Sequence, residues 1–290
     1  MLVLIYGHKG WIGTKVIKLL QEQNIEFFRG NVRVNNKLEL EEEIKTVNPT
    51  HIMSFIGRTH GKGFTTIDYL EQKGKIYENV RDNLFSPLLL AILCKKYNIH
   101  FTYMGTGCIF KFDKDHPYEK EVNGFTEECL PNFFGSGYSV VKGFTDELMH
   151  MFKDTVLNLR IRMPISDDWS TRNFIYKITH YEKICSIKNS MTVLPELLPL
   201  MIDMAKNKVT GTINMTNPGL ISHNRILELY KEIVDKDFTW KNFSIEEQAK
   251  ILAADRSNNY LDTSKIERMY KVDNIETAII KILKYLSKYK

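Results

Sequence analysis

A tyrosine and a lysine four residues apart, Tyr138 and Lys142, are the first candidates for chemistry in the sequence. Residues at this spacing lie one turn apart on the same face of a helix. A lysine ammonium close to a phenol favours the phenolate and lowers the pKa of the tyrosine. Such a tyrosine can give or take a proton at a carbonyl or alcohol oxygen while a hydride moves at the carbon. Thr106, between two glycines, can hydrogen-bond the same oxygen, although alone it is typical of a hydroxyl that caps a turn.

A glycine-rich turn near the start of the chain is the second candidate site. Gly7, Gly10 and Gly13 follow a short apolar segment and precede a helix-like segment. Glycines at such a turn let the backbone and a helix N-terminus approach a pyrophosphate. The spacing is G-x-x-G-x-x-G rather than G-x-G-x-x-G, and an ordinary glycine-rich turn is the alternative. Because the turn opens a strand–helix–strand pattern, we expect the whole loop to bind a dinucleotide: Gly7, His8, Lys9, Gly10, Trp11, Ile12 and Gly13.

The residue at the end of the second expected strand distinguishes the two nicotinamide cofactors. An NAD site usually carries Asp or Glu there, and the carboxylate holds the ribose 2′-hydroxyl. This chain has Arg29 instead, and Lys9 or Arg33 can assist it. A guanidinium suits a 2′-phosphate, while a solvated surface arginine is the alternative. The sequence therefore predicts NADPH as the cofactor, with NADH left possible.

Short apolar segments and helix-like segments alternate through the first part of the chain. Strands are expected at residues 2–6, 25–28, 51–56, 100–104 and 156–161, and helices at 11–23, 38–47, 67–97 and 138–152. Pro87 is expected to kink or divide the long third helix. This order predicts an α/β fold, with a Rossmann-like, doubly wound parallel sheet that is covered on both faces.

The pattern changes after Pro164, where the expected elements become shorter. Helices are expected at 222–234, 244–252, 263–270 and 275–288, and strands at 191–194 and 211–214. We expect the piece that contains these two strands to return to the main sheet. The sequence therefore predicts a dinucleotide-binding domain, residues 1–164 with about 188–214, and a smaller mixed α/β C-terminal substrate domain, residues 165–187 and 215–290.

Composition and charge exclude several classes of protein. The chain has 290 residues, of which 43% are hydrophobic and 26% charged, as is ordinary for a folded protein. Its net charge of +5 is mild and its basic residues are scattered, so we expect an anionic small molecule and no nucleic acid. Four scattered cysteines predict neither a disulfide framework nor a metal site. No segment is long enough for a signal-peptide core or a membrane span, so we expect a cytoplasmic protein without membrane contact.

The glycine turn, the Thr106 turn and the Tyr138/Lys142 pair together resemble the extended short-chain dehydrogenase/reductase family over nearly the whole chain. Within it, the chain is similar to the bifunctional UDP-4-keto-6-deoxy-glucose 3,5-epimerase/4-reductases of plant and giant-virus rhamnose synthesis. Eight stretches carry this narrower resemblance: 6–13, 105–110, 162–166, 172–175, 189–194, 216–219, 238–243 and 256–259.

The resemblance implies two chemistries in one pocket. Thr106, Tyr138 and Lys142 would serve the reduction of a C4 ketone by NADPH, with Tyr138 as the proton donor to the oxygen. Cys108 and Lys177 would serve as an acid–base pair for epimerisation at C3 and C5. Which of the two is the base does not follow from the sequence. The alternatives are a small buried hydrophobic residue for Cys108 and a solvated helix lysine for Lys177.

The same resemblance extends the candidate site. For the cofactor it adds Gly57, Arg58, Met163 and Pro164. For the sugar nucleotide it adds Asn173, Trp240 and Arg256, whose alternatives are exposed polar residues and, for Trp240, packing in the core.

One departure from the related 4,6-dehydratases is informative. Those enzymes carry Thr-Asp-Glu where this chain has Thr106, Gly107 and Cys108. We therefore expect no dehydration here, and a separate UDP-glucose 4,6-dehydratase as the pathway partner that supplies the UDP-4-keto-6-deoxy-glucose. A homodimer is also expected. The rival interpretations are a single-function dTDP-type nucleotide-sugar 4-keto reductase and a non-catalytic NADP-binding regulatory subunit.

Overall fold

Six parallel strands form one sheet in the part of the chain that the computed structural model describes, residues 1–118 and 123–289. They are β1 (Leu2–Tyr6), β2 (Glu26–Arg29), β3 (His51–Ser54), β4 (His100–Thr106), β5 (Val156–Ile161) and β6 (Gly211–Asn214). The strand order is β2-β1-β3-β4-β5-β6, and every neighbouring pair is parallel. The predicted doubly wound parallel sheet is therefore confirmed. Its order reverses between β1 and β3, and in open α/β sheets ligands bind beyond the strand ends at such a point.

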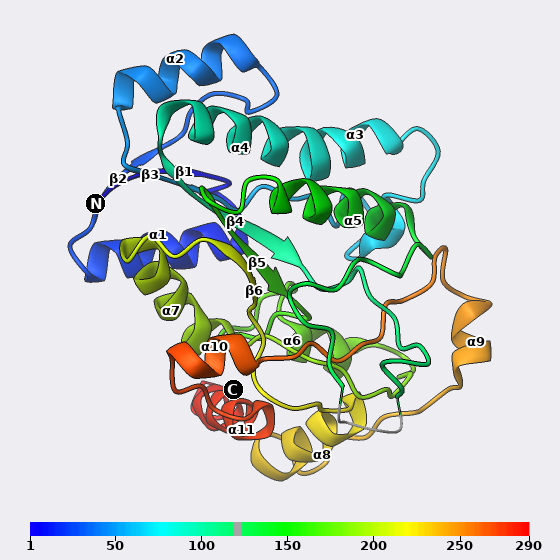
Figure 1. The fold of residues 1–290 in the computed structure, drawn as a ribbon. Helices are drawn as coiled ribbons and strands as arrows, with labels where there is room; N and C mark the ends of the chain where they lie inside the picture. The colour runs from blue at the N-terminus through cyan, green and yellow to red at the C-terminus, as the bar shows by residue number, and fades with distance from the viewer. Residues whose placement is uncertain (119–122, 290) are drawn as a thin grey trace.

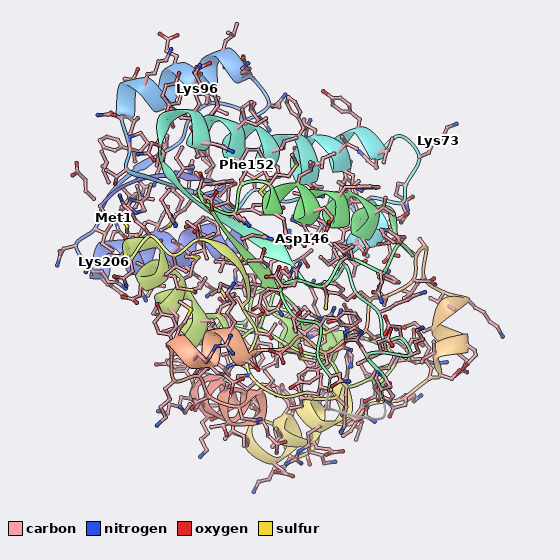
Figure 2. All side chains as sticks on the ribbon, in the orientation of Figure 1. Met1, Lys73, Lys96, Asp146, Phe152 and Lys206 are labelled. Carbon is pink, nitrogen blue, oxygen red and sulfur yellow. The ribbon has the colours of Figure 1, made fainter. Side chains whose placement is uncertain are left out.

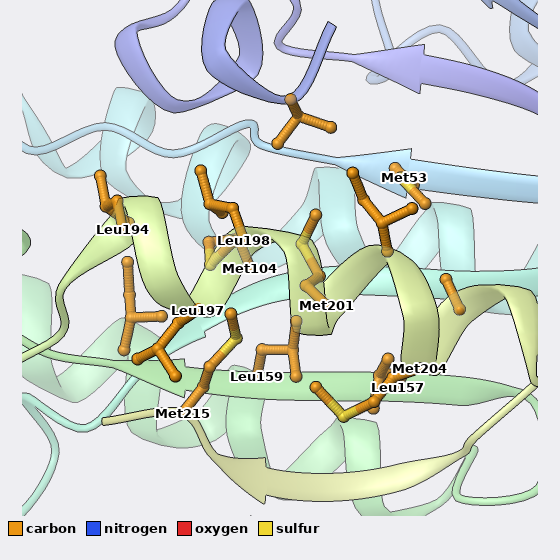
Figure 3. Close-up of a cluster of buried hydrophobic side chains, with 14 of the residues drawn as sticks. Met53, Met104, Leu157, Leu159, Leu194, Leu197, Leu198, Met201, Met204 and Met215 are labelled. Atoms are coloured by element: carbon orange, nitrogen blue, oxygen red, sulfur yellow. The ribbon is translucent and has the colours of Figure 1, made fainter. Parts of the chain in front are cut away.

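Helices cover both faces of this sheet (Figure 1). One face carries α1 (Trp11–Glu22) and α7 (Leu194–Lys206), and the other carries α2 (Lys37–Val47), α4 (Ser86–Tyr97) and α5 (Gly137–His150). Successive side chains of a strand point to opposite faces, so Val3 and Ile5 pack with α1 and α7, whereas Leu4 and Tyr6 pack with α2 and α4. Figure 3 shows the first of these clusters, in which α7 packs its leucines and methionines against the strands.

Figure 2 shows labelled charged side chains both on the surface and inside the molecule. Lys73, Lys96 and Lys206 project from the periphery, whereas Asp146 of α5 lies inside the molecule. Asp146 accepts from the buried Arg160 of β5 at 2.6 Å. These lysines belong to the surface, which agrees with a mild positive charge that is spread rather than gathered.

Shorter helices follow the fifth strand and build a separate apolar cluster. It contains residues from α6 (Phe174–His180), α8 (His223–Ile233) and α11 (Ile275–Leu286). Two further helices are α9 (Ile245–Ala249) and α10 (Ser264–Met269), and Ile266 of α10 packs with the α7 side of the sheet. The residue limits of two domains stay a prediction.

The expected long helix before β4 is divided. A short 3₁₀ turn η1 (Ile67–Tyr69) comes first, and then α3 (Ile76–Val80), a π turn η2 (Arg81–Phe85) and α4 follow one another. Pro87 has no N–H for the carbonyl of Asn83 one turn earlier, and the Thr145 hydroxyl of α5 donates to that carbonyl at 2.7 Å instead. The π turn directs the Asn83 amide onto the backbone of Arg58, with both hydrogen bonds at 2.9 Å. The irregularity therefore holds the loop after β3.

The strand expected at residues 191–194 is wrong. Only a single bridge joins Val193 to Ile165, and α7 begins at Leu194. The backbone N–H of Val193 donates to the Asn217 side chain at 2.9 Å. A side-chain amide therefore takes the place of the backbone partner that a neighbouring strand would supply. Strand 211–214 is confirmed as β6. In the described residues, no helix has both the length and the apolar character needed to cross a bilayer.

Candidate active site

A cavity of about 740 Å³ lies at the carboxyl ends of the strands. Its inner wall comes from the β1–α1 loop, the ends of β3, β4 and β5, and α5. Its outer wall comes from α6 and from residues 65–67, 181–187 and 248–258. It brings together many of the residues singled out from the sequence: Lys9, Gly10, Trp11, Ile12, Gly13, Gly57, Thr106, Cys108, Tyr138, Lys142, Met163, Pro164, Lys177 and Arg256.

The glycine turn has the shape of a backbone cradle. Gly7 has φ +74°, and a Cβ there would lie 2.6 Å from the carbonyl carbon of Phe55. A Cβ on Gly13 would overlap the carbonyl oxygen of Gly7. Helix α1 begins at Trp11 with no side chain capping it, so its first N–H groups are available to an anion. The turn therefore fits a pyrophosphate.

The two residues of the Tyr-x-x-x-Lys motif are buried on one face of α5. Ser136 caps this helix by accepting from the N–H of Ser139 at 3.0 Å. Tyr138 is hydrogen-bonded to the side chain of Thr106, at the end of β4. Lys142, one turn on, donates instead to the hydroxyl of Tyr103 in β4.

The pKa of Tyr138 differs from the sequence-based expectation. Burial raises it well above the ordinary value, Cys108 raises it further, and the hydrogen bond to Thr106 works in the opposite direction. The Lys142 ammonium, expected to lower this pKa, is hydrogen-bonded to Tyr103 in this structure. Burial lowers the pKa of Lys142 itself to about 8, although the negative charges of Asp146 and Cys108 act to raise it.

Cys108 and Lys177 reach the same cavity from different elements. The strand ends at Thr106, and the N–H of Cys108 turns back to the Thr106 hydroxyl at 3.1 Å. The carbonyl of Cys108 accepts from Ser139 of α5 at 2.7 Å, which fixes the turn to that helix. Lys177 comes from α6 and donates to the carbonyl of Thr65 at 3.3 Å.

The pKa of Lys177 is lowered to about 8 by burial, and the neighbouring Arg172 lowers it as well. A lysine with that pKa exchanges protons near neutral pH, as an acid–base group requires. The solvated helix lysine that was the alternative is not what the structure shows.

Two of the residues expected to hold the sugar nucleotide lie outside the cavity lining. Asn173 is fully buried, accepts from the N–H of Ile175 as the cap of α6, and donates to the carbonyls of Ser166 and Asp168 at 2.7 Å. Trp240 donates to Asn224 and packs in the C-terminal apolar cluster. Their polar groups are occupied by protein partners.

Among the expected cofactor residues, four lie outside the lining. Gly7 and His8 form the turn behind it, and Arg29 is exposed at the end of β2. Arg58 points to acidic residues, with Nε 3.1 Å from Asp82. Arg256 lines the cavity and forms an ion pair with Asp68.

Five residues that line the cavity were not predicted as site residues from the sequence: His60, Arg162, Arg172, Cys185 and His223. Their segments carry no catalytic motif, although the resemblance covers Arg162 and Arg172 without giving them a role. Met163, which was expected, has φ +38°, an unfavourable conformation for a side chain with a Cβ. Among the described residues, no group of histidines, cysteines or carboxylates has the arrangement of a metal site.

A parallel sheet of this order, with a glycine turn after β1 and a buried Tyr/Lys helix at the strand ends, defines a dinucleotide-binding enzyme of the short-chain dehydrogenase/reductase type. The model of the RmlD substrate binding domain matches residues 1–124. The solved UDP-rhamnose synthase of Acanthamoeba polyphaga mimivirus is 54% identical, with a TM-score of 0.95 over 98% of this chain and 99% of that one. A dTDP-4-dehydrorhamnose reductase of Bacillus anthracis, solved with NADP, shares the fold at 14% identity and a TM-score of 0.78, over 97% of this chain and 96% of that one.

Two plant relatives complete the comparison. The Arabidopsis thaliana bifunctional dTDP-4-dehydrorhamnose 3,5-epimerase/dTDP-4-dehydrorhamnose reductase is 43% identical over 97% of this chain and 91% of its own length. An Arabidopsis trifunctional UDP-glucose 4,6-dehydratase/UDP-4-keto-6-deoxy-D-glucose 3,5-epimerase/UDP-4-keto-L-rhamnose-reductase is 43% identical over 96% of this chain and 41% of its own length. The chain therefore belongs to the family of these nucleotide-sugar reductases and is an NADPH-dependent oxidoreductase that acts on a nucleotide sugar.

Proposed function

We propose that this protein converts UDP-4-keto-6-deoxy-D-glucose to UDP-L-rhamnose, by epimerising C3 and C5 and then reducing the C4 ketone with NADPH. The carrying observation is that one cavity contains both Thr106 with Tyr138 and Cys108 with Lys177. The first pair suits proton donation to a ketone oxygen, and the second suits proton exchange at carbon. The names of the plant relatives, which include both an epimerase and a reductase, support the combination.

The inner wall suits a dinucleotide. The turn from Gly7 to Gly13 and the uncapped start of α1 would hold the pyrophosphate, and Met163 and Pro164 would lie beside the nicotinamide. Bound NADPH supplies a hydride. Arg29, exposed at the end of β2, is free of any carboxylate partner in the described chain and would meet the 2′-phosphate. NADH is the alternative cofactor.

Epimerisation requires a proton to leave one face of the sugar and to return on the other. Hydrogens at C3 and C5 are acidic because each lies next to the C4 ketone. One member of the Cys108/Lys177 pair takes the proton, and the electron pair of the C–H bond moves to the C4 oxygen. The other member returns a proton to the opposite face, and the ketone is restored.

Reduction uses residues already held in contact. The Tyr138 hydroxyl gives its proton to O4, and Thr106 holds the same oxygen by a hydrogen bond. The raised pKa of Tyr138 keeps the phenol protonated before the reaction. Lys142, whose ammonium is fixed by Tyr103, places a positive charge near the developing alkoxide.

The substrate must come from another enzyme, because no carboxylates stand where the 4,6-dehydratases have them. A UDP-glucose 4,6-dehydratase is therefore the proposed pathway partner. The trifunctional plant relatives, whose names include that activity, are more than twice as long as the region they share with this chain. A homodimer is also part of the proposal.

Product identification tests the proposal directly. The protein is incubated with UDP-4-keto-6-deoxy-glucose and NADPH in deuterated water, and the sugar is identified by NMR. We expect UDP-L-rhamnose with deuterium at C3 and C5. A 6-deoxy sugar without inversion would favour a single-function reductase, and bound NADPH without consumption would favour a regulatory protein.

A matched pair of variants assigns the proton exchange. Cys108→Ala should abolish deuterium incorporation at C3 or C5 and leave NADPH binding intact. Cys185→Ala is the control, because Cys185 lines the same cavity and burial raises the pKa of its thiol. Equal incorporation by wild type and Cys108→Ala would contradict the role of Cys108.

A further inference from the structure

The first turn of α5 is hydrogen-bonded to distant segments on both sides of Tyr138. After Tyr138, the Ser139 hydroxyl donates to the Cys108 carbonyl at 2.7 Å. Before it, the backbone N–H of Gly137 donates to Oε1 of Glu71 at 2.8 Å, from a segment 66 residues earlier in the chain. Tyr138 itself is only 8% exposed. The position of this tyrosine therefore depends on two contacts that come from outside its own helix.

The N–H of Gly137 needs an acceptor from elsewhere, because the first N–H groups of a helix have no partner within the helix. The capping residue of α5, Ser136, accepts from the N–H of Ser139 and leaves that of Gly137 to another group. A Cβ on Gly137 would lie 3.3 Å and 3.4 Å from the two carboxylate oxygens of Glu71. The glycine therefore allows the carboxylate to approach closely, at the end of the helix where a negative charge is favourable.

Glu71 is the last residue of a segment, 65–71, that we call the strap. The first residue of the strap accepts from the side chain of Lys177 through its backbone carbonyl, at 3.3 Å. Its middle residue, Asp68, forms an ion pair with Arg256. The strap therefore contacts the outer wall of the cavity at two points and the start of α5 at a third.

The strap also packs against groups of the candidate active site. Tyr69 and Leu70 form a small buried apolar cluster with Tyr138, and Cys108 packs against this cluster. Ile67 lines the cavity and packs against the same cluster. A shift of the strap would therefore change the surroundings of Tyr138, and the carboxylate contact fixes the strap to the residue directly before this tyrosine.

We propose that Glu71 is a positioning residue for the reduction, which acts through Gly137 to hold the Tyr138 hydroxyl where the ketone oxygen of the nucleotide sugar must lie. This rests on the proposed function, in which Tyr138 gives its proton to O4. The carboxylate of Glu71 neither contacts the sugar nor exchanges a proton in this step. Without it, the first turn of α5 is held on one side only, and a displacement of about 1 Å at a reacting group can cost roughly 100-fold in rate.

Kinetics of NADPH oxidation separate this role from closure of the outer wall. The substrate is the epimerised ketone, UDP-4-keto-L-rhamnose, so that only the reduction is observed. Glu71→Ala should lower kcat by about tenfold and leave KM for the sugar within about twofold of wild type. Asp68→Asn frees the strap from Arg256 instead, so it should raise KM more than it lowers kcat.

A matched control removes a capping contact from another helix. The Asn274 side chain accepts from the N–H of Glu276 at the start of α11, and Asn274 does not line the cavity. Asn274→Ala therefore also removes a side-chain acceptor from the first turn of a helix, and it should leave kcat and KM at their wild-type values.

Two conservative variants distinguish the contact from the charge. Glu71→Gln keeps the length of the side chain and an oxygen acceptor, so its kcat should stay within about threefold of wild type. Glu71→Asp keeps the charge but is one methylene shorter than the 2.8 Å contact requires, so its kcat should fall toward that of Glu71→Ala. A low kcat in Glu71→Gln with a wild-type kcat in Glu71→Asp would contradict positioning by the hydrogen bond.

Amide hydrogen exchange, followed by mass spectrometry, measures the contact without any reaction. Peptides that contain Gly137 should exchange faster in Glu71→Ala and Glu71→Asp than in wild type, because the N–H loses its acceptor. In Asn274→Ala the same peptides should exchange at the wild-type rate.

Thermal unfolding identifies variants that have lost their fold. If Glu71→Ala is one of them, Glu71→Asp decides, because it keeps a carboxylate near the start of the helix. A folded Glu71→Ala or Glu71→Asp with the wild-type kcat, or with a raised KM alone, would overturn the positioning role. If the wild-type protein does not reduce UDP-4-keto-L-rhamnose, the proposed function fails, while the exchange of the Gly137 peptides still shows whether Glu71 holds the start of α5.

Discussion

The two walls of the cavity hold their residues by different means. On the inner wall, Gly13 and Tyr138 are placed by backbone geometry and by the regular elements that contain them. On the outer wall, Lys177 binds the carbonyl of Thr65, 112 residues away, and Arg256 pairs with Asp68, 188 residues away. The inner wall therefore depends on local structure and the outer wall on single contacts between distant segments.

Substitutions in the two walls should therefore differ in the size of their effects. A change on the inner wall alters a rigid frame or one of the groups proposed to act on the ketone, so its effects should be large. On the outer wall Lys177 also has a proposed chemical role, but the other changes there remove contacts between partly exposed side chains, whose individual contributions to the free energy of unfolding are small. Variants in the two walls can therefore be ranked.

The largest effect is expected for Tyr138→Phe on the inner wall. Loss of the proton donor to O4 should lower the rate of ketone reduction by about 10²- to 10⁴-fold. NADPH oxidation with the keto sugar gives the rate, and fluorescence of bound NADPH shows that the site persists. Tyr103→Phe is the matched control: it also removes a buried hydroxyl, but one that contacts Lys142, so its loss should be at least tenfold smaller. Equal losses would mean that Tyr138 has no special role.

The second effect concerns the cradle for the cofactor. A Cβ at Gly13 overlaps the Gly7 carbonyl oxygen, so Gly13→Ala forces the backbone apart and should cost about 1–3 kcal/mol in stability. NADPH affinity should fall by more than about tenfold, as calorimetry would show. At Gly10 the added Cβ would lie 3.2 Å from the same oxygen, so Gly10→Ala should do less harm. A larger loss of NADPH affinity in Gly10→Ala than in Gly13→Ala would show that the backbone shape of this turn does not determine cofactor binding.

Most residues of the inner wall could be predicted from the sequence, because the patterns that mark them are local. The glycine spacing, the apolar strands and the Tyr-x-x-x-Lys pair each lie within one or two elements, and the sheet was predicted from their order. The missed π turn follows from a contact: Thr145 of the next helix satisfies the Asn83 carbonyl that Pro87 leaves free. The environment of Lys142 was likewise missed, because its partner Tyr103 lies 39 residues away on β4.

The outer wall was predicted less well, for the same reason. Asn173 and Trp240 have residue types that suit a sugar nucleotide, yet one caps α6 and the other packs in an apolar cluster. The same limit applies on the inner wall, where only the fold shows that Arg162, after β5, has neutral acceptors while Arg160 pairs with a carboxylate. Lys177 was found through its family resemblance, and its lowered pKa depends on burial that no spacing reveals.

A smaller effect is expected for the pair that fastens the outer wall. Burial raises the pKa of Asp68, but hydrogen bonds from Thr66 and Arg256 outweigh it and leave the pKa below its usual value. Asp68 therefore stabilises the fold above the pKa of the unfolded carboxyl, and this stability is lost as pH falls through the folded pKa. Asp68→Asn should lower the free energy of unfolding by about 1 kcal/mol at about pH 7, and by less below about pH 4.

A double-mutant cycle with Arg256→Gln checks this pair by urea unfolding. The coupling energy between the two positions should be about 0.5–1 kcal/mol at about pH 7 and should vanish in acid. Additive losses at both pH values would show that the contact contributes nothing. If Arg256 also binds the sugar nucleotide, KM should rise more in Arg256→Gln than in Asp68→Asn.

The smallest effect is a shift in pH dependence set by Arg172. Burial and then the charge of Arg172 lower the pKa of Lys177 to about 8, so deuterium exchange that needs its ammonium should decline above about pH 8. Arg172→Gln removes the repulsion and should raise the Lys177 pKa, moving this decline to higher pH by less than about one unit. His60 also faces this group, but burial and the nearby cations lower its pKa to about 4, so it is neutral throughout the range. Rates of deuterium incorporation from about pH 6 to about pH 10 measure the shift. A decline that stays fixed or moves to lower pH in Arg172→Gln would show that Lys177 does not supply the proton, since removing a neighbouring cation can only strengthen its hold on one.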